Sequence, residues 1–300
     1  MIAFQFPGQG SQFAGMGQTL AGTFPEARAI FDRADAALGF SLSALCFEGP
    51  EDALKLTENT QPAILTASIA AWEVLKTRVQ PAFVAGHSLG EYSALVAAGA
   101  LSFEDAVRTV RKRGQYMQEA VPAGVGAMAA LRTSEDAVQP ILDQAAEGDV
   151  LTAANFNAPD QVVIAGHAGA VDRALKLARG LKLQVSAPFH CPLMKPAQER
   201  LAADLAQIAF HDLAIPLVNN VRAELVTTGD AARQGLIDQV PNSVRWTATV
   251  RLLAEQGVTT FVEVGPKTVL SGLLKKIDAT RTGLKFGEAA DLEAVLEATR

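Results

Sequence analysis

The first hundred positions of the chain alternate between short apolar runs and longer amphipathic segments. The apolar runs at 2–6 and 81–87 predict buried strands, whereas apolar residues recur at helical spacing in 24–38 and 60–78. Strands that alternate with helices are typical of a parallel sheet covered by helices. We therefore expect an α/β domain in this part of the chain.

The segment from residue 124 to residue 188 has a different order of elements. Its pattern predicts strands at 125–131, 150–155, 161–165 and 182–187, with helices at 134–146 and 168–179 and a turn at 157–160. The order β-α-β-β-α-β is that of the ferredoxin-like unit. We expect a small domain at 124–188, inserted into a larger domain formed by 1–123 and 189–300.

After residue 190 the α/β pattern of the larger domain resumes. The expected elements are helices at 194–208, 231–240, 247–256 and 268–277 and strands at 215–219 and 260–266. In such folds ligands bind at the carboxyl edge of the parallel sheet and between domains. The sequence therefore predicts a cleft between the larger and the smaller domain.

The segment Gly86-His87-Ser88-Leu89-Gly90 lies between a predicted strand and a predicted helix. Gly-x-Ser-x-Gly in this context is the nucleophile-elbow pattern, in which a sharp, strained turn presents the serine hydroxyl at the sheet edge. The Leu89 N–H and the helix N-terminus then point at the same place, which suits acyl transfer. A chance Gly/Ser turn is the alternative, but the strand before and the helix after favour the elbow.

Composition narrows the classes of partner. The 300 residues carry a net charge of −6, which argues against binding to nucleic acid and to an anionic membrane surface. An anionic substrate would therefore need a local cation. Cys46 and Cys191 are too few and too far apart for a disulfide framework or a metal site. The first residues have no leader pattern and no apolar run approaches the roughly 20 residues of a membrane span, so we expect a cytoplasmic protein.

A serine nucleophile requires a base, and the chain has four histidines. His87 adjoins Ser88 but points elsewhere at a tight turn, and we expect it to pack against the elbow. His167 and His211 lie in polar, turn-like contexts typical of the surface. His190 follows the insertion, where the chain re-enters the larger domain, and from the residues alone it stands only modestly above a structural histidine.

Two further features are weak on their own. The loop 7–12, which contains Gln9, is rich in glycine, yet a lone Pro-Gly-Gln-Gly is more often a simple turn; it lacks the Gly-Lys-Ser/Thr of a phosphate-binding loop. The run Arg111-Lys112-Arg113 is typical of a solvated helix face. Its three side chains point in different directions, and periodicity hardly distinguishes Arg113 from Arg111.

Several motifs together resemble malonyl-CoA:acyl carrier protein transacylases of fatty-acid synthesis and the related acyltransferase domains of polyketide synthases. The matching pieces occur in the family's order over essentially the whole chain, at 6–12, 86–92, 113 with 117–118, 155–157, 189–191 and 264–266. The resemblance implies an α/β-hydrolase-like core with a parallel sheet and an inserted ferredoxin-like (βαββαβ) domain. This agrees with the pattern described above.

The resemblance also implies roles for individual residues. Ser88 would form a malonyl ester and His190 would act as its base and acid, with ping-pong kinetics. Arg113 would bind the malonyl carboxylate through paired hydrogen bonds. The remaining implied positions are the N–H groups of Gln9 and Leu89 as oxyanion hole, the backbone carbonyl of Gln239 as the group that orients His190, and Phe189, Asn155 and Met117 in the substrate pocket. Phe189 would crowd an α-methyl group and so favour malonyl units.

The resemblance implies a CoA thioester substrate and acyl carrier protein as a transient partner, with no metal and no other cofactor. Candidate contacts for this acidic carrier are Lys182, Lys195, Lys267, Lys275 and Lys276. Three alternatives stay open. They are a free-standing acyltransferase of a polyketide synthase, a serine esterase or thioesterase, which should have an acidic partner for its histidine, and a scaffold domain without catalysis.

Overall fold

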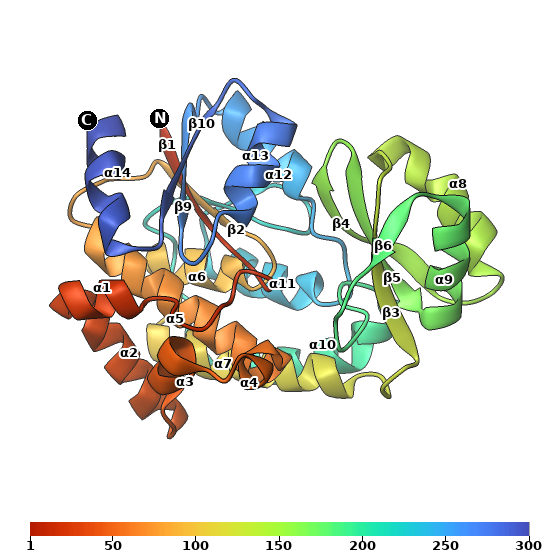
Figure 1. Ribbon diagram of the computed structural model, residues 1–300, viewed down its shortest axis with the longest axis horizontal. Coiled ribbons are helices and arrows are strands. Elements are labelled where there is room, and N and C mark those ends of the chain that lie inside the picture. The colour runs from red at the N-terminus through yellow and green to blue at the C-terminus, as the bar shows by residue number, and fades with distance from the viewer. Residues whose placement is uncertain (300) are drawn as a thin grey trace.

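The computed structural model describes residues 1–299 and separates into a larger and a smaller part, each built on one β-sheet (Figure 1). Over these residues the larger sheet, sheet A, has the strand order β10-β9-β1-β2-β7-β8. Its strands are parallel except for β8, which is antiparallel to β7. Their bounds are β1 Ile2–Phe6, β2 Phe83–Gly86, β7 Leu217–Val218, β8 Leu225–Val226, β9 Thr260–Val264 and β10 Thr282–Phe286.

Helices cover both faces of sheet A because its strands are apolar on both sides. In β1, Phe4 and Phe6 belong to the main core beneath α5 and α6, whereas Ala3 packs with Trp246 of α12 and Leu270 of α13. The helices of this part are α1 Gln18–Thr23, α2 Pro25–Leu38, α3 Leu42–Glu48, α4 Glu51–Lys55, α5 Thr57–Leu75, α6 Gly90–Ala97, α7 Phe103–Glu119, α10 Lys195–Leu205, α11 Gly229–Gln239, α12 Trp246–Glu255, α13 Val269–Ile277 and α14 Leu292–Ala298. None of the helices within residues 1–299 combines the length and apolar character needed to cross a bilayer.

The smaller part contains an antiparallel sheet, sheet B, in the order β4-β5-β3-β6. Helices α8 and α9 pack on one face around Leu131, Val138, Ile164 and Val171. The bounds are β3 Gly126–Leu131, α8 Glu135–Ala146, β4 Leu151–Ala158, β5 Gln161–His167, α9 Ala168–Leu177 and β6 Gly180–Lys182. This is the β-α-β-β-α-β order expected from the sequence.

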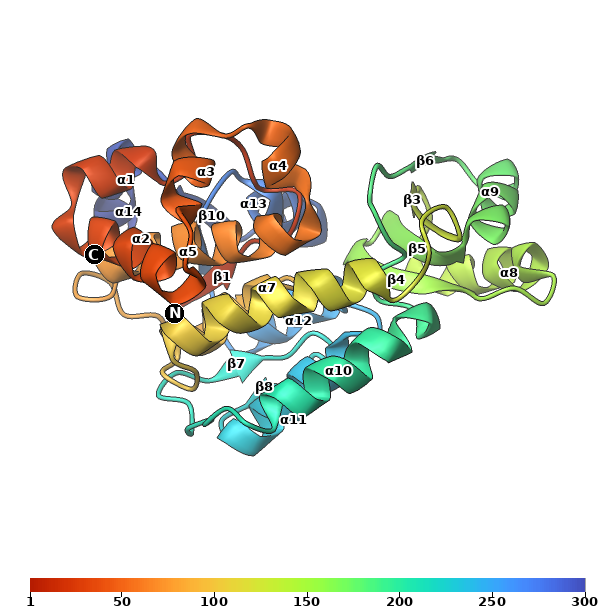
Figure 2. The same ribbon diagram turned by 90° about the horizontal axis from the view of Figure 1, so that it is seen from below.

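The two parts are joined by the chain itself and by hydrogen bonds along sheet B. The chain enters the smaller part after α7 and returns through α10, and these helices lie side by side (Figure 2). The segment before α12 continues the edge of sheet B, since Val244 N–H donates to Ala154 and its carbonyl accepts from Phe156, both at 2.9 Å. These hydrogen bonds hold sheet B against the carboxyl edge of sheet A.

Two predicted elements, a strand and a turn, need correction, and the ends of most others shift by up to three residues. The strand expected at 182–187 is Gly180–Lys182 instead, and the following residues leave the sheet so that Leu183 and Val185 line a pocket. The turn expected at 157–160 is shorter, because β4 continues to Ala158. The short strands β8 and β10 and helices α1, α3, α4 and α14 were not predicted, since so few residues carry little periodicity.

Candidate active site

Ser88 lies at the sharp turn between β2 and α6. Its φ of 52° is in the left-handed region, which is strained for a residue with a side chain. The turn is closed so tightly that a Cβ on Gly86 would lie 1.9 Å from the Gly90 carbonyl oxygen, and one on Gly90 would lie 2.0 Å from that of Phe6. The two glycines of the elbow are therefore required by backbone contact.

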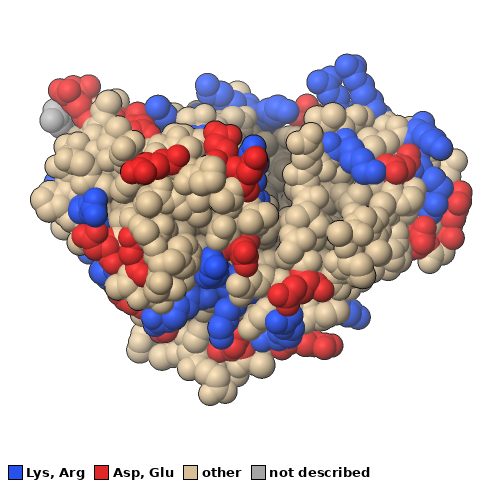
Figure 3. Space-filling view, turned by 60° about the horizontal axis from the view of Figure 1, so that its bottom comes forward, with Lys and Arg blue, Asp and Glu red and all other residues tan. Residues whose placement is uncertain are grey.

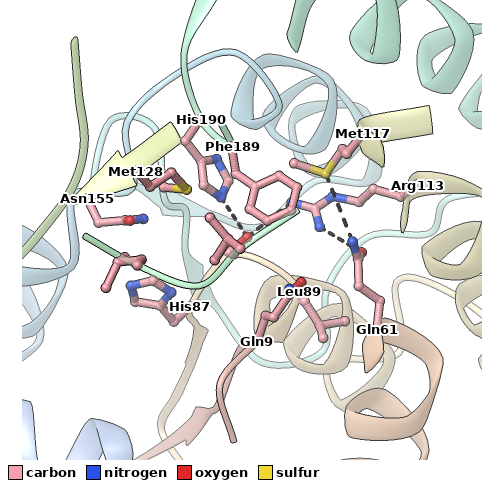
Figure 4. Close-up of a pocket in the computed structure, with 13 residues that line it drawn as sticks. Gln9, Gln61, His87, Leu89, Arg113, Met117, Met128, Asn155, Phe189 and His190 are labelled. Atoms are coloured by element: carbon pink, nitrogen blue, oxygen red, sulfur yellow. Dashed lines mark hydrogen bonds between the residues drawn. The ribbon is translucent and has the colours of Figure 1, made fainter. Parts of the chain in front are cut away.

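A cavity of about 120 Å³ opens above Ser88 between the two parts. The space-filling view shows a hollow between them, with Lys and Arg side chains along the upper edge of that face (Figure 3). The lining residues converge from both sides (Figure 4). They are Gln9, Gln61, His87, Ser88, Leu89, Arg113, Met117, Phe189 and His190 of the larger part, and Met128, Asn155, Leu183 and Val185 of the smaller part or the segment that leaves it.

His190 is placed as a base for Ser88. Its Nε2 lies 2.7 Å from Ser88 Oγ and its Nδ1 lies 3.0 Å from the backbone oxygen of Gln239. A carbonyl oxygen only accepts, so Nδ1 carries the proton and Nε2 is left to accept from the hydroxyl. Burial, together with the positive charge of Arg113, lowers the pKa of His190 to about 3, so the imidazole is neutral near pH 7.

Arg113 reaches the same hydroxyl from the opposite side (Figure 4). It is 2% exposed, and its Nη2 donates to Ser88 Oγ at 3.1 Å and to Gln239 Oε1 at 2.8 Å. Its Nη1 donates to Gln61 Oε1 at 2.7 Å. The guanidinium is thus held by neutral amides, and no carboxylate within residues 1–299 pairs with it directly.

The rest of the basic run faces away from the pocket. Arg111 donates to Asn59 and stacks 4.5 Å over the Phe40 ring. Lys112 pairs with Asp204 at 3.0 Å on the surface. The three successive side chains therefore point in three directions, and Arg113 is the member of the run that lines the cavity.

The loop that carries Gln9 touches the elbow because β1 and β2 are neighbouring parallel strands that end at the same edge, with Phe6 paired to Gly86. A Cβ on Gly8 would lie 2.4 Å from the His87 carbonyl oxygen, which shows how closely the two loops approach. Within residues 1–299 the backbone N–H groups of Gln9 and Leu89 have no hydrogen-bond acceptor. Both donors lie beside Ser88 and stay available to a ligand.

The other predicted pocket residues lie around the same cavity. Phe189 and Met117 contribute apolar surface, and Asn155 lies at a bulge in β4. His87 also borders the cavity, but its Nε2 lies 2.8 Å from Asn157 Oδ1 and its ring packs 5.6 Å from Trp246. The structure thus brings Gln9, Ser88, Leu89, Arg113 and His190 together and leaves His87 as a packing residue.

Three buried residues near Ser88 were missed by the sequence analysis. Asn220 braces the elbow, since its Oδ1 accepts from Ser88 N–H and its Nδ2 donates to the Gly86 carbonyl, both at 2.6 Å. Gln61 holds Arg113, and Glu91 accepts from Gln239. Glu91 offered a signal, because it is a lone acid in the otherwise uncharged helix 90–97. Asn220 and Gln61 carry no such signal in the sequence.

The candidate carrier-binding lysines are exposed at several places. Lys267 donates from Nζ to the Gly10 carbonyl at 3.1 Å, which places it beside the Gln9 loop. Lys182 pairs with Asp172 at 2.6 Å, and Lys276 pairs with Asp160 at 3.6 Å. Lys195 and Lys275 lie on exposed faces at the start of α10 and the end of α13.

Known proteins resemble the chain over its whole length. The model of the acyl transferase domain matches residues 3–285. A malonyl CoA-acyl carrier protein transacylase of Escherichia coli (strain K12) is 50% identical over 99% of each chain. An acyl carrier protein S-malonyltransferase of Vibrio cholerae has a crystal structure with a TM-score of 0.96 and 46% identity, over 98% of this chain and 99% of that one. A malonyl-transacylase solved in complex with a type II PKS acyl-carrier protein has a TM-score of 0.96 and 44% identity over 99% of both chains.

Proposed function

The chain belongs to the malonyl CoA-acyl carrier protein transacylases, within the acyl transferase domain family, and on that premise we propose that Ser88 carries the malonyl group between the two substrates. The chain is therefore an acyl carrier protein S-malonyltransferase. The observation that carries the mechanism is that one oxygen, Ser88 Oγ, lies 2.7 Å from His190 Nε2 and 3.1 Å from Arg113 Nη2. Base, nucleophile and anion-binding cation meet at that point.

In the first half-reaction, Ser88 Oγ attacks the thioester carbon of malonyl-CoA while His190 Nε2 takes the hydroxyl proton. The carbonyl oxygen gains negative charge, which the N–H groups of Gln9 and Leu89 stabilise. The carbon–sulfur bond then breaks, and the proton on His190 goes to the CoA sulfur. In the second half-reaction the phosphopantetheine thiol of the carrier gives its proton to His190 and its sulfur attacks the ester carbon. The bond from that carbon to Ser88 Oγ then breaks, and His190 returns the proton to Ser88 Oγ, which restores the hydroxyl and the neutral imidazole.

The backbone oxygen of Gln239 takes the place that a carboxylate has in most serine hydrolases, since it accepts from His190 Nδ1 at 3.0 Å. A carbonyl fixes the tautomer of the imidazole without a full negative charge. This arrangement does not favour the esterase alternative, which would have an acidic partner for the histidine. Intact Ser88, His190 and Arg113 likewise do not favour a scaffold without catalysis.

Arg113 selects the acyl group in this proposal. Its guanidinium lies among neutral amides in a buried site, where an incoming carboxylate supplies the countercharge. An acetyl group has no carboxylate and leaves that charge unmatched. Phe189, directly before His190, narrows the cavity and favours malonyl over branched units.

Arg113→Ala is expected to lower kcat/KM for malonyl-CoA by roughly 30- to 5,000-fold, because losing one partner of a buried charge pair costs about 2–5 kcal/mol. The rate with acetyl-CoA should change far less, so the malonyl-to-acetyl preference should collapse. Steady-state rates with both thioesters measure this, with Arg111→Ala as the control from the same helix. An unchanged preference in Arg113→Ala would remove Arg113 as the specificity residue.

The carrier protein docks, we propose, at the mouth of the cleft beside the Gln9 loop. Lys267 marks that rim, and Lys275 and Lys276 lie on the neighbouring helix α13. Opposite charges raise the rate of association with an acidic partner. Lys275→Glu with Lys276→Glu should lower the rate with carrier protein roughly tenfold at low salt, while acylation by malonyl-CoA alone stays unchanged. Rapid-quench measurements follow the two half-reactions, acylation of the enzyme and transfer to the carrier, separately. An equal fall in both rates would place the docking surface elsewhere.

Fatty-acid synthesis is the process we assign to the enzyme, with a polyketide carrier as the second candidate. The second candidate is favoured by the relative in complex with a type II PKS acyl-carrier protein, which is 44% identical to this chain. Rates with a fatty-acid carrier and a polyketide carrier, compared at equal concentration, distinguish the two.

We propose a cytoplasmic location, because Cys46 and Cys191 are both free and buried, as in reducing compartments.

A further inference from the structure

Glu91 is a buried carboxylate directly beneath the proposed catalytic residues. It lies in the first turn of α6, three residues after Ser88, and is 1% exposed. Its Oε2 accepts from Gln239 Nε2 at 2.7 Å and from the backbone N–H of Asn220 at 3.1 Å. Burying a carboxylate is costly unless it is hydrogen-bonded, so a charge kept at this place calls for an explanation beyond packing.

The two residues that Glu91 holds are those that position the reacting groups. Asn220 bonds to both sides of the elbow, at Ser88 N–H and at the Gly86 carbonyl. Gln239 holds His190 through its backbone oxygen and Arg113 through its side-chain oxygen. Each proposed functional group is therefore one hydrogen bond away from a residue that Glu91 fixes.

The chemistry of a carboxylate determines how the Gln239 side chain is oriented. An ionised carboxylate only accepts hydrogen bonds, so the Gln239 amide must turn its NH₂ toward Glu91. Its oxygen is then directed at Arg113, as observed at 2.8 Å. A glutamine at position 91 could offer either a donor or an acceptor, so it would lose the constraint that a carboxylate places on the Gln239 amide. Arg113 and the Ser88 carbonyl oxygen, which accepts from Gln239 Nε2 at 3.1 Å, would then hold that amide without it.

The Gln239 amide also separates two opposite charges. The carboxylate of Glu91 and the guanidinium of Arg113 interact across it, and each favours the ionised form of the other. A direct ion pair would occupy Arg113, whereas an amide between the two leaves the guanidinium available to a substrate carboxylate. Ser88 and His190, with φ of 52° and 57°, are strained positions that must be held by such surroundings.

We infer that Glu91 is the positioning residue of the active site, which acts through Gln239 and Asn220 to align Ser88, His190 and Arg113. This inference rests on the proposed function of those three residues. The ionised form is the one that does so. Burial raises the pKa of Glu91 to about 7, although the hydrogen bonds from Gln239 and Asn220 act to lower it. The ionisable group whose charge acts on Glu91 is Arg113 of α7. The phenol of Tyr92 in α6 is neutral because burial raises its pKa, and the contacts of Glu91 from α11 and the segment after β7 are amides.

Removing the charge of Glu91 should have opposite effects on stability and on activity. A carboxyl whose pKa is higher in the folded than in the unfolded state stabilises the fold at low pH, and that contribution is lost as pH rises from about 4.5 through about 7. Removing the charge with Glu91→Gln should therefore leave the melting temperature at pH 8 unchanged or higher. The same change should lower activity, since misplacing reacting groups by about 1 Å can cost about 100-fold.

The experiment measures kcat/KM for acylation by malonyl-CoA between pH 5 and 9, with melting temperatures, for native enzyme, Glu91→Gln and Glu263→Gln. Glu263 is a matched control, because it is a buried carboxylate that caps α13 through Leu270 and Ser271 and has no bond to the pocket residues. We expect native kcat/KM to rise with pH around 7, and Glu91→Gln to be roughly 10- to 100-fold slower at pH 8 and to lack that rise. Glu263→Gln should keep the rise in kcat/KM with pH.

Equal rates and equal pH profiles in native enzyme and Glu91→Gln would overturn the inference. The inference would also be overturned if Glu91→Gln lost activity only to the extent that its melting temperature fell, because that result is expected of a purely structural carboxylate. If Glu91→Gln does not fold, the native profile decides, since the absence of a rise around pH 7 contradicts the assignment and its presence supports it. Failure of native enzyme to be acylated at all would instead contradict the proposed function of Ser88.

Discussion

Ser88→Ala is expected to abolish malonyl transfer, with a fall in kcat of about 10⁶-fold, the order seen when the nucleophile of a serine protease is removed. The reason is that in the proposed mechanism both half-reactions pass through the ester on Ser88 Oγ, and no second hydroxyl occupies its place between His190 and Arg113 among residues 1–299. The measurement is the rate at which malonyl-CoA is converted to malonyl-carrier protein at saturating concentrations of both substrates.

Ser93→Ala is the matched control for this variant. Ser93 lies buried in α6, the helix that follows Ser88, and its hydroxyl has no hydrogen-bond partner within residues 1–299. Its removal should leave kcat close to the native value, because this hydroxyl makes no hydrogen bond and Ser93 is not among the residues that line the cavity. Transfer by Ser88→Ala at more than about one hundredth of the native rate would mean that the acyl group does not pass through Ser88.

His190→Ala is expected to lower kcat to a similar extent, by about 10⁴- to 10⁶-fold, because nucleophile and base act as one unit. The double variant with Ser88→Ala should therefore be no slower than Ser88→Ala alone. The step to measure is acylation of the enzyme by malonyl-CoA, and the CoA released in that step is the signal. His211→Ala, at an exposed position, serves as the control.

The pH dependence of the native enzyme tests the role of His190 as well. Its pKa is lowered to about 3, mainly by burial and then by the charge of Arg113, so the free enzyme keeps a neutral base down to about pH 4. Protonation of His190 should not limit kcat/KM at neutral pH. A histidine proton that titrates near its ordinary pKa in an NMR experiment on the free enzyme would contradict this environment.

Much of the fold could be predicted from the sequence because its elements are strongly patterned. The strand Ile2–Phe6 agrees with the structure at both ends, and the helix expected at 24–38 is Pro25–Leu38. The α/β class with an added ferredoxin-like unit is confirmed by the two sheets and by the structural relatives. Strand 182–187 was wrong, because its apolar residues 183 and 185 serve the cavity instead of a sheet.

The proposed active site was predictable where a motif carries its own geometry. The elbow required Gly86 and Gly90 for backbone contact, and the structure shows those contacts. Arg113 could not be separated from Arg111 by periodicity, since the choice depends on which side of α7 faces Ser88 in three dimensions. The family resemblance supplied that choice.

The supporting residues could not be predicted because their partners come from distant segments. Asn220 bonds to an elbow 132 residues earlier in the chain, and Gln61 to an arginine 52 residues after it. Polar amides at such positions look like ordinary surface residues in a sequence. Only the fold reveals that they lie in the core beneath the cavity.

The central claim is that malonyl groups are carried as an ester of Ser88, and peptide mapping by mass spectrometry tests it most directly. The native enzyme is mixed briefly with malonyl-CoA or with acetyl-CoA in the absence of carrier protein, then quenched in acid and digested. We predict one malonyl group per chain, located on Ser88, and little acetyl adduct. A malonyl group on another residue, or rapid CoA release with no adduct on Ser88, would contradict it.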